Sequence, residues 1–133
     1  MKRGFRRLMG GIGGWFLARA GATGAYGAGI RYLERGDVAA AAQAFADAQS
    51  MWLRELGPWH ACVVLAMEKR ADCYVRMGRV QEGVRLYERA LALDRALRDE
   101  GTGRVPALTA ELAEARAFLA APFSGGAEPV ASS

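Results

Sequence analysis

The side chains that most often carry out catalysis or bind metals are scarce in this sequence. Its one histidine is His60, and its two cysteines are Cys62 and Cys73. These groups cannot complete a four-ligand zinc site, and two thiols ~16 Å apart along one helix cannot form a disulfide bond. We expect both cysteines to be core thiols and His60 to act in a turn at a helix start. With no recognisable nucleophile motif or phosphate-binding loop, we predict that the chain is not an enzyme and uses no cofactor or metal.

Positive charge is concentrated near the N-terminus. The chain of 133 residues has a formal net charge of +4, and 52% of its residues are hydrophobic. Residues 1–33 contain 6 basic residues and no acidic one, whereas residues 34–133 contain 12 basic and 14 acidic residues. The body therefore lacks the uniformly basic face that binds nucleic acid, and we do not expect nucleic acid as a partner. The composition predicts one folded domain.

The basic N-terminal segment, residues 1–21, is also rich in large apolar residues, and we name it the arm. Its glycines disfavour a free helix, so we expect it to become ordered on a surface. The residues expected to make that contact are Arg3, Phe5, Arg6, Arg7, Ile12, Trp15 and Phe16. Four alternatives stay open for the arm: docking on protein, a secretory signal, a helix at a membrane surface, and binding to nucleic acid.

An internal repeat with a period of 42 residues organises the rest of the chain. Shifting the sequence by 42 residues pairs aromatic with aromatic side chains and small with small side chains. The matched pairs are Gly29 with Ala71, Tyr32 with Tyr74, Ala41 with Gly83, Phe45 with Tyr87, and Ala48 with Ala90. A second shift places Ala71 on Ala113, but this third copy is degenerate and lacks its second half. Such a period is typical of helical repeats.

Each copy is predicted to be two helices joined by a tight turn. Gly36 and Gly78 are expected to end the first helix of each copy, because glycine accepts the left-handed conformation found there. Apolar residues at three- and four-residue spacing predict the other helices. Breaks at residues 56–58 and 101–103 precede the second copy and a last helix over about residues 105–121. We expect residues 22–121 to form the helical domain and residues 122–133 to be a disordered tail.

This pattern resembles the tetratricopeptide repeat (TPR) family, in the 42-residue variety found in kinesin light chains. The family's small and aromatic positions match Gly29, Ala71, Ala113, Tyr32 and Tyr74. The departures are Ala28 and Arg70 at its bulky position and Trp59 in its inter-repeat turn. The resemblance implies an all-α fold: a short right-handed α-solenoid of two TPR-like hairpins plus a C-terminal capping helix, preceded by the arm. An unrelated alanine-rich helical bundle is the alternative.

TPR proteins bind peptides in a concave groove formed by the first helix of each hairpin. Carrying family positions over implies a groove lined by Tyr26, Ile30, Leu33, Leu65, Glu68, Lys69, Asp72, Arg76 and Glu114. Where chaperone-binding members hold a C-terminal carboxylate with lysine and asparagine, this chain has Glu68 and Asp72. We expect an acidic strip of Glu68, Asp72 and Glu114 to favour a basic or mixed peptide, from a partner or from the arm of another copy.

The resemblance thus implies a non-catalytic adaptor or scaffold in the cytoplasm, within a larger complex or a homo-oligomer. About three repeats are usually needed for stability, so we expect the arm or another chain to cover the first hairpin. We expect the last helix to close the opposite end, and Trp52 and Trp59 to staple the hairpins together; an exposed tryptophan there would instead mark a contact site. The alternative is a membrane-associated or exported accessory protein whose arm is an anchor or a signal.

Overall fold

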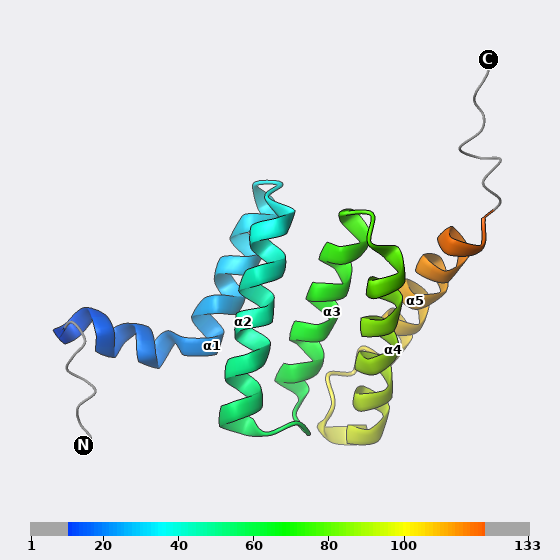
Figure 1. Cartoon of the computed structure of the whole chain (residues 1–133). Coiled ribbons are helices and arrows are strands. Elements are labelled where there is room, and N and C mark those ends of the chain that lie inside the picture. Colours follow the sequence, from blue (N-terminus) through cyan, green and yellow to red (C-terminus); the bar gives the residue numbers. More distant parts are fainter. Residues whose placement is uncertain (1–10, 122–133) are drawn as a thin grey trace, which may run out of the picture.

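All regular secondary structure between residues 11 and 121 is helical. The structure is a computed structural model that describes the backbone of residues 11–121 and the side chains of residues 21–121. The elements are α1 (Gly11–Glu34), α2 (Val38–Leu56), α3 (Ala61–Arg76), α4 (Val80–Leu97), the 3₁₀ turn η2 (Arg98–Glu100) and α5 (Val105–Ala120). Each α-helix packs against the next one along the chain (Figure 1). The predicted all-α fold is confirmed.

The helix ends form where the local sequence predicts them. Gly36 and Gly78 have φ angles of 82° and 85°, which favour glycine, and they end α1 and α3. Asp37 caps α2, because its carboxylate accepts a hydrogen bond from the backbone N–H of Ala40 at 3.3 Å. His60 caps α3 through Nδ1, which accepts from the backbone N–H of Cys62 at 3.0 Å. The expected structural role of His60 in a turn is confirmed.

Small residues allow the helices of each pair to approach closely. A Cβ atom added to Gly29 on α1 would lie 2.5 Å from Cε1 of Phe45 on α2. A Cβ atom added to Gly83 on α4 would lie 2.7 Å from Cγ2 of Val75 and 3.1 Å from the carbonyl oxygen of Ala71, both on α3. Larger side chains would push the helices apart at these crossings. Gly29 and Gly83, two small positions of the 42-residue repeat, therefore lie at close contacts between helices.

The two tryptophans near the α2–α3 turn have different surroundings. Trp52 is buried, and its ring centroid lies 5.6 Å from that of Tyr26 on α1. Trp59 is 67% exposed. It follows Pro58 in the turn, beyond the end of α2 and before the first residue of α3, so neither helix covers it. The expectation that both tryptophans staple the hairpins is wrong for Trp59.

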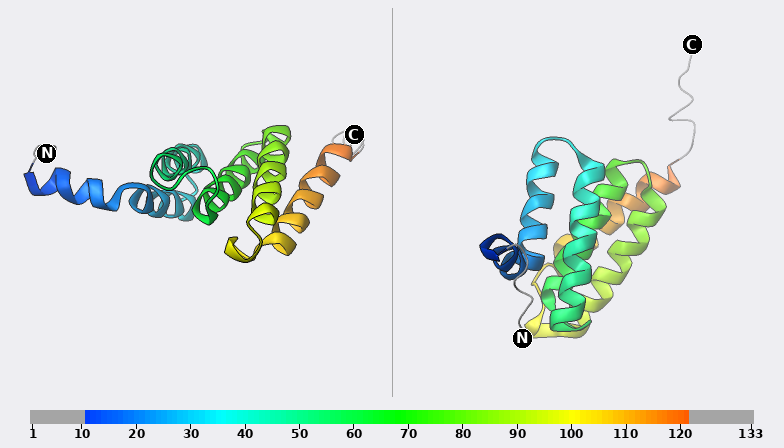
Figure 2. Two further views of the ribbon diagram at one scale, coloured as in Figure 1. Left: turned by 90° about the horizontal axis from the view of Figure 1, so that it is seen from below. Right: turned by 60° about the vertical axis from the view of Figure 1, so that its left-hand side comes forward.

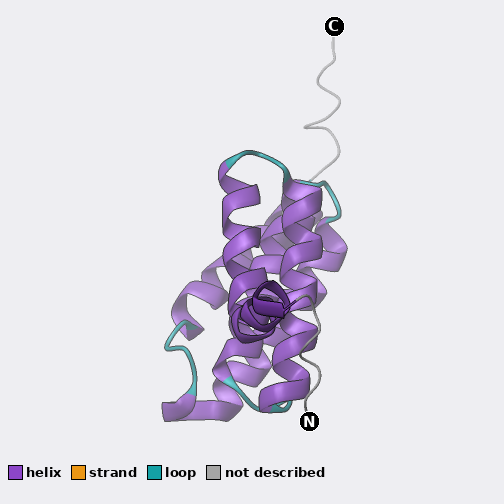
Figure 3. Cartoon of the chain, turned by 90° about the vertical axis from the view of Figure 1, so that its left-hand side faces the viewer, coloured by secondary structure: helices purple, strands orange, loops and turns teal. Residues whose placement is uncertain are grey.

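The N-terminal part of α1 leaves the row of helices. Gly21 has φ 39° and ψ −126°, which bends α1 sharply. The backbone of residues 11–20 extends away from the other helices (Figures 1 and 2), and Figure 3 looks along this part of α1. Several predictions concern parts of the chain outside the described residues. They are the contacts of Arg3, Phe5, Arg6 and Arg7, the contacts of the side chains of Ile12, Trp15 and Phe16, and the disordered tail at residues 122–133.

The last helix packs on α4 along one face. Leu108, Leu112 and Ala115 are buried, as the apolar spacing predicts, whereas Leu119 is 47% exposed. Ala113 is exposed, although its equivalents Gly29 and Ala71 are buried. The reason is that no sixth helix follows α5 among residues 11–121. None of the helices in that range has an apolar stretch long enough to cross a bilayer.

Candidate functional site

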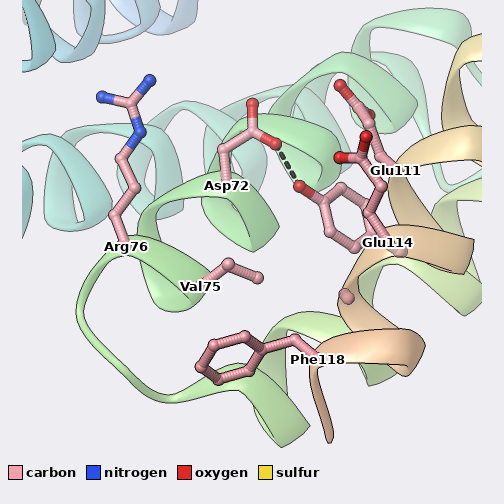
Figure 4. A pocket seen from close by; sticks show the side chains of 8 residues that line it. Asp72, Val75, Arg76, Glu111, Glu114 and Phe118 are labelled. Carbon is pink, nitrogen blue, oxygen red and sulfur yellow. Dashed lines mark hydrogen bonds between the residues drawn. The ribbon is translucent and has the colours of Figure 1, made fainter. Parts of the chain in front are cut away.

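A pocket of about 420 Å³ lies between α3, α4 and α5 (Figure 4). Three of the predicted groove residues, Asp72, Arg76 and Glu114, line it. The other lining residues are Val75 from α3, Tyr87 from α4, and Glu111, Ala115 and Phe118 from α5. The pocket therefore combines carboxylates and a guanidinium with an apolar wall, and the wall includes Phe118, which is 67% exposed.

The loop before α5 sets the position of that helix. Buried Asp94, near the end of α4, accepts hydrogen bonds from the backbone N–H of Thr102 at 2.6 Å and from its hydroxyl at 2.7 Å. Because charge-assisted hydrogen bonds to a buried carboxylate are strong, they hold the loop against α4. The break at residues 101–103 is predictable from its glycines, but the role of Asp94 has no signal in the sequence spacing.

Asp72 is held at the pocket wall by Tyr87. The Tyr87 hydroxyl donates a hydrogen bond to the Asp72 carboxylate, as the dashed line in Figure 4 shows. Burial raises the pKa of Asp72, and the bond from Tyr87 partly opposes that change. Burial, and next the hydrogen bond to Asp72, raise the pKa of Tyr87. The pair fixes the direction of a carboxylate that the resemblance to the TPR family predicted to lie in the groove.

Glu68 does not contribute to an exposed acidic strip. It is 1% exposed, and its Oε1 accepts a hydrogen bond from Nε of Arg104 at 2.6 Å, while Nη2 of Arg104 contacts Oε2. Arg104 immediately precedes α5 and reaches back to α3. The expected strip of Glu68, Asp72 and Glu114 is therefore corrected: Glu68 is a buried ion-pair partner, and Asp72 and Glu114 line the pocket.

Glu111 is the acidic residue of the site that sequence reasoning missed. Its Oε2 lies 3.8 Å from Nη2 of Arg104, and its buried Oε1 has no hydrogen-bond partner within residues 21–121. Burial, followed by a hydrogen bond with the Glu68 carboxyl, raises the pKa of Glu111 to about 8. The raised pKa favours the neutral form of Glu111 relative to a carboxyl in water. The closeness of Glu111 to Arg104 depends on how α5 packs and not on a local sequence pattern.

The remaining predicted groove residues do not line this pocket. Tyr26 packs edge-on against Phe45, with ring centroids 5.3 Å apart, and burial raises its pKa. Ile30 and Leu33 are partly buried against the cluster that contains Phe45. Leu65 and Lys69 are half-buried on α3. The groove residues of α1 pack within the first hairpin, because the close approach at Gly29 brings α1 against α2.

Both cysteines lie among the described residues of α3. Cys62 and Cys73 are free thiols, and burial raises the pKa of Cys73 to about 11, which disfavours its thiolate at neutral pH. Between residues 21 and 121, no group of three or more His, Cys, Asp or Glu side chains is arranged to hold a metal ion. The candidate site is thus a pocket with three carboxyl groups, one guanidinium and an apolar wall. Comparison of the chain with known protein families, curated proteins and solved structures finds no match.

Proposed function

We propose that this chain is a non-catalytic adaptor that binds a partner polypeptide in the pocket between α3 and α5. The observation that carries this proposal is the pocket wall, where Asp72 and Glu114 lie beside Phe118. Carboxylates bind guanidinium and ammonium groups through charge-assisted hydrogen bonds, and an exposed aromatic ring binds apolar side chains. The pocket therefore suits a segment in which basic and apolar residues alternate.

A TPR-like arrangement of the hairpins is part of the proposal. In support of it, residues 42 positions apart are buried in both hairpins: Gly29 and Ala71, Ala41 and Gly83, and Phe45 and Tyr87. The pocket also lies between α3 and α5, which carry the first-helix positions of the second and third copies of the repeat. In a right-handed α-solenoid of this type the first helices line the concave side, where a partner peptide binds.

The ion pair between Glu68 and Arg104 limits which partner segments the pocket can bind. Since Arg104 pairs with Glu68, the pocket offers the carboxyl groups of Asp72, Glu111 and Glu114 beside the guanidinium of Arg76. This balance favours a partner segment with a few basic residues among apolar ones over a highly charged polycation. A protein that binds such a segment without catalysing a reaction would act as an adaptor subunit within a larger complex.

Fluorescence anisotropy with labelled synthetic peptides tests the proposal. The probes are a peptide that alternates arginine and leucine and a matched peptide with glutamate in place of arginine. We expect the basic peptide to bind more tightly, and Glu114→Lys to weaken its binding by about tenfold, or ~1.4 kcal/mol. The control is Glu55→Lys, an equal charge change at an exposed position of α2, which should leave the affinity unchanged.

Two results would overturn the adaptor proposal. One is equal affinity for the basic and the acidic peptide. The other is an equal loss of affinity in Glu114→Lys and Glu55→Lys, which would reflect overall charge and not the pocket.

A further inference from the structure

A second pocket adjoins the pocket of Figure 4, and we name them the second and the first pocket. The second pocket has a volume of about 550 Å³ and lies between the first part of α4 and the end of α5. Phe118 lines both pockets, and Leu119 lines the second one only. Figure 4 shows the Phe118 ring on the side of the first pocket away from Asp72. A segment that lies in the first pocket and crosses this ring therefore enters the second pocket.

The two pockets have opposite balances of charged groups. The first pocket has three carboxyl groups and one guanidinium, as described above. The second pocket has the guanidinium groups of Arg79 and Arg85 and the carboxylate of Glu82. Since opposite charges attract across an interface, the charge that each pocket favours in a bound segment changes sign at Phe118.

Arg79 is held by neighbours within the chain. Its Nε donates a hydrogen bond to Oε1 of Glu82 at 2.5 Å, and its Nη2 donates to Oε2 at 2.8 Å. Its guanidinium also lies 4.6 Å from the centroid of the Tyr74 ring, within the range of a cation–π contact. Arg79 and Glu82 therefore satisfy each other and form a wall of the second pocket.

Arg85 is the cation that the second pocket offers to a ligand. It is exposed on α4, three residues after Glu82, and it makes no ion pair within residues 21–121. An arginine guanidinium binds a carboxylate through two parallel hydrogen bonds. Arg89, also exposed on α4, lines neither pocket. The position of Arg85 beside Phe118 and Leu119 therefore distinguishes it from other exposed arginines.

Phe118 and Leu119 give the two pockets a shared apolar wall. Their side chains are 67% and 47% exposed, and they are adjacent at the end of α5. Large apolar side chains that are exposed side by side mark interaction sites, because a partner can bury them. The surface thus presents, in order, an acidic pocket, an apolar wall and a basic pocket.

We infer that the partner is a polypeptide segment with basic residues at one end, an apolar residue in the middle and an acidic residue at the other end. The basic end binds in the first pocket, the apolar residue packs on Phe118, and the acidic residue pairs with Arg85 in the second pocket. This inference rests on the proposed function and adds the second pocket to it. A segment that is basic throughout would place a cation against Arg85, which disfavours it.

Fluorescence anisotropy with extended peptides tests the inference. The parent is the peptide that alternates arginine and leucine, with both ends blocked to remove the terminal charges. Two glutamates are added at its N-terminal or its C-terminal end, because either chain direction satisfies the two pockets. Each extended peptide has a match with two glutamines. We expect one of the glutamate peptides to bind about tenfold more tightly than its match, although glutamates near an acidic pocket would by themselves weaken binding.

Arg85→Gln should remove this gain and leave the affinity for the parent peptide within about twofold of its original value. The matched control is Arg89→Gln, an equal charge change on the same helix, which should keep the gain. Circular dichroism should show both variants folded, because both side chains are exposed.

The inference is overturned if neither glutamate peptide binds more tightly than its glutamine match. It is also overturned if Arg85→Gln keeps the gain, or if Arg85→Gln and Arg89→Gln reduce it equally, which would reflect overall charge and not the second pocket. In each of these cases the adaptor proposal stands as long as Glu114→Lys weakens binding of the parent peptide and Glu55→Lys does not. If Glu114→Lys has no such effect, both proposals fail.

Discussion

Arg104 and Glu68 form an ion pair across 36 residues of sequence, with Nε of Arg104 2.6 Å from Oε1 of Glu68. The Glu68 side chain is 2% exposed, and the Arg104 side chain is 40% exposed. The pair joins the start of α5 to α3, two helices that are not consecutive in the chain. The pocket lies between these helices, and the ion pair helps to hold the start of α5 near α3.

Arg104→Ala should destabilise the protein by ~3 kcal/mol, the lower end of the range for breaking a buried ion pair. The reason is that Glu68 would stay buried without its cation, although the partial exposure of Arg104 lets water reduce the loss. Urea denaturation measures the effect. The control is Arg116→Ala, which removes an exposed ion pair with Glu88 and should cost less than ~1 kcal/mol. Equal losses in the two variants would contradict the assigned role of Arg104.

Gly29→Ala should destabilise the protein by ~1–3 kcal/mol, because the added methyl group overlaps the Phe45 ring. Gly27→Ala, two residues earlier on the same helix, should instead stabilise it by up to ~1 kcal/mol. A Cβ atom there meets only the end of the Arg31 side chain at 3.5 Å, and alanine is the better helix former. The two midpoints of thermal denaturation should move in opposite directions. A gain in stability from Gly29→Ala would show that α1 and α2 are further apart than described.

Glu111 should make the protein less stable as the pH rises. Its pKa is raised from an ordinary value of 4.5 to about 8, so the folded chain binds more protons than the unfolded chain between these values. Stability therefore decreases as the pH rises through that window, and the raised pKa of Asp72 acts in the same direction. The groups that face Glu111 are Glu68 and Asp72 from α3, Tyr87 from α4 and Arg104.

Glu111→Gln should flatten this dependence. Urea denaturation between about pH 5 and pH 8 would show a smaller loss of stability in the variant than in the unmodified protein. Glu114→Gln, exposed on the same helix, is the control and should leave the slope unchanged. If the stability of Glu111→Gln decreased more steeply with pH than that of the unmodified protein, the pKa of Glu111 would not be raised in the folded chain. That result would contradict the buried position of this carboxyl.

His60→Ala should destabilise the protein by ~1 kcal/mol through the loss of the cap on α3. His60→Asn should retain most of the stability, because an asparagine side chain can accept the same hydrogen bond from a backbone N–H of the first turn. Thermal denaturation of the two variants measures the difference. Equal losses would indicate that His60 acts through packing and not through its Nδ1 atom.

Much of the fold is predictable from short-range sequence signals. Gly36 and Gly78 mark helix ends, because the left-handed backbone that ends a helix depends on a single residue. The spacing of Leu108, Leu112 and Ala115 identifies the buried face of α5, because a helix places such positions on one side. The resemblance to the TPR family predicted that Asp72, Arg76 and Glu114 lie in one groove, and all three line one pocket.

The rest depends on contacts between segments far apart in the sequence. No spacing rule pairs Glu68 with Arg104, and the burial of Glu68 follows from where the loop before α5 lies. The raised pKa of Glu111 likewise requires α5 to lie beside α3.

The sequence by itself determined which residues form helices, where each helix ends and which face is apolar, because these properties depend on residues within a few turns of one another. Only the tertiary structure decided which charges are paired, which tryptophan is exposed and which face of α5 is left open. Burial and ion pairing depend on what the neighbouring helices cover, and an alanine such as Ala113 suits a buried crossing and an exposed surface equally well.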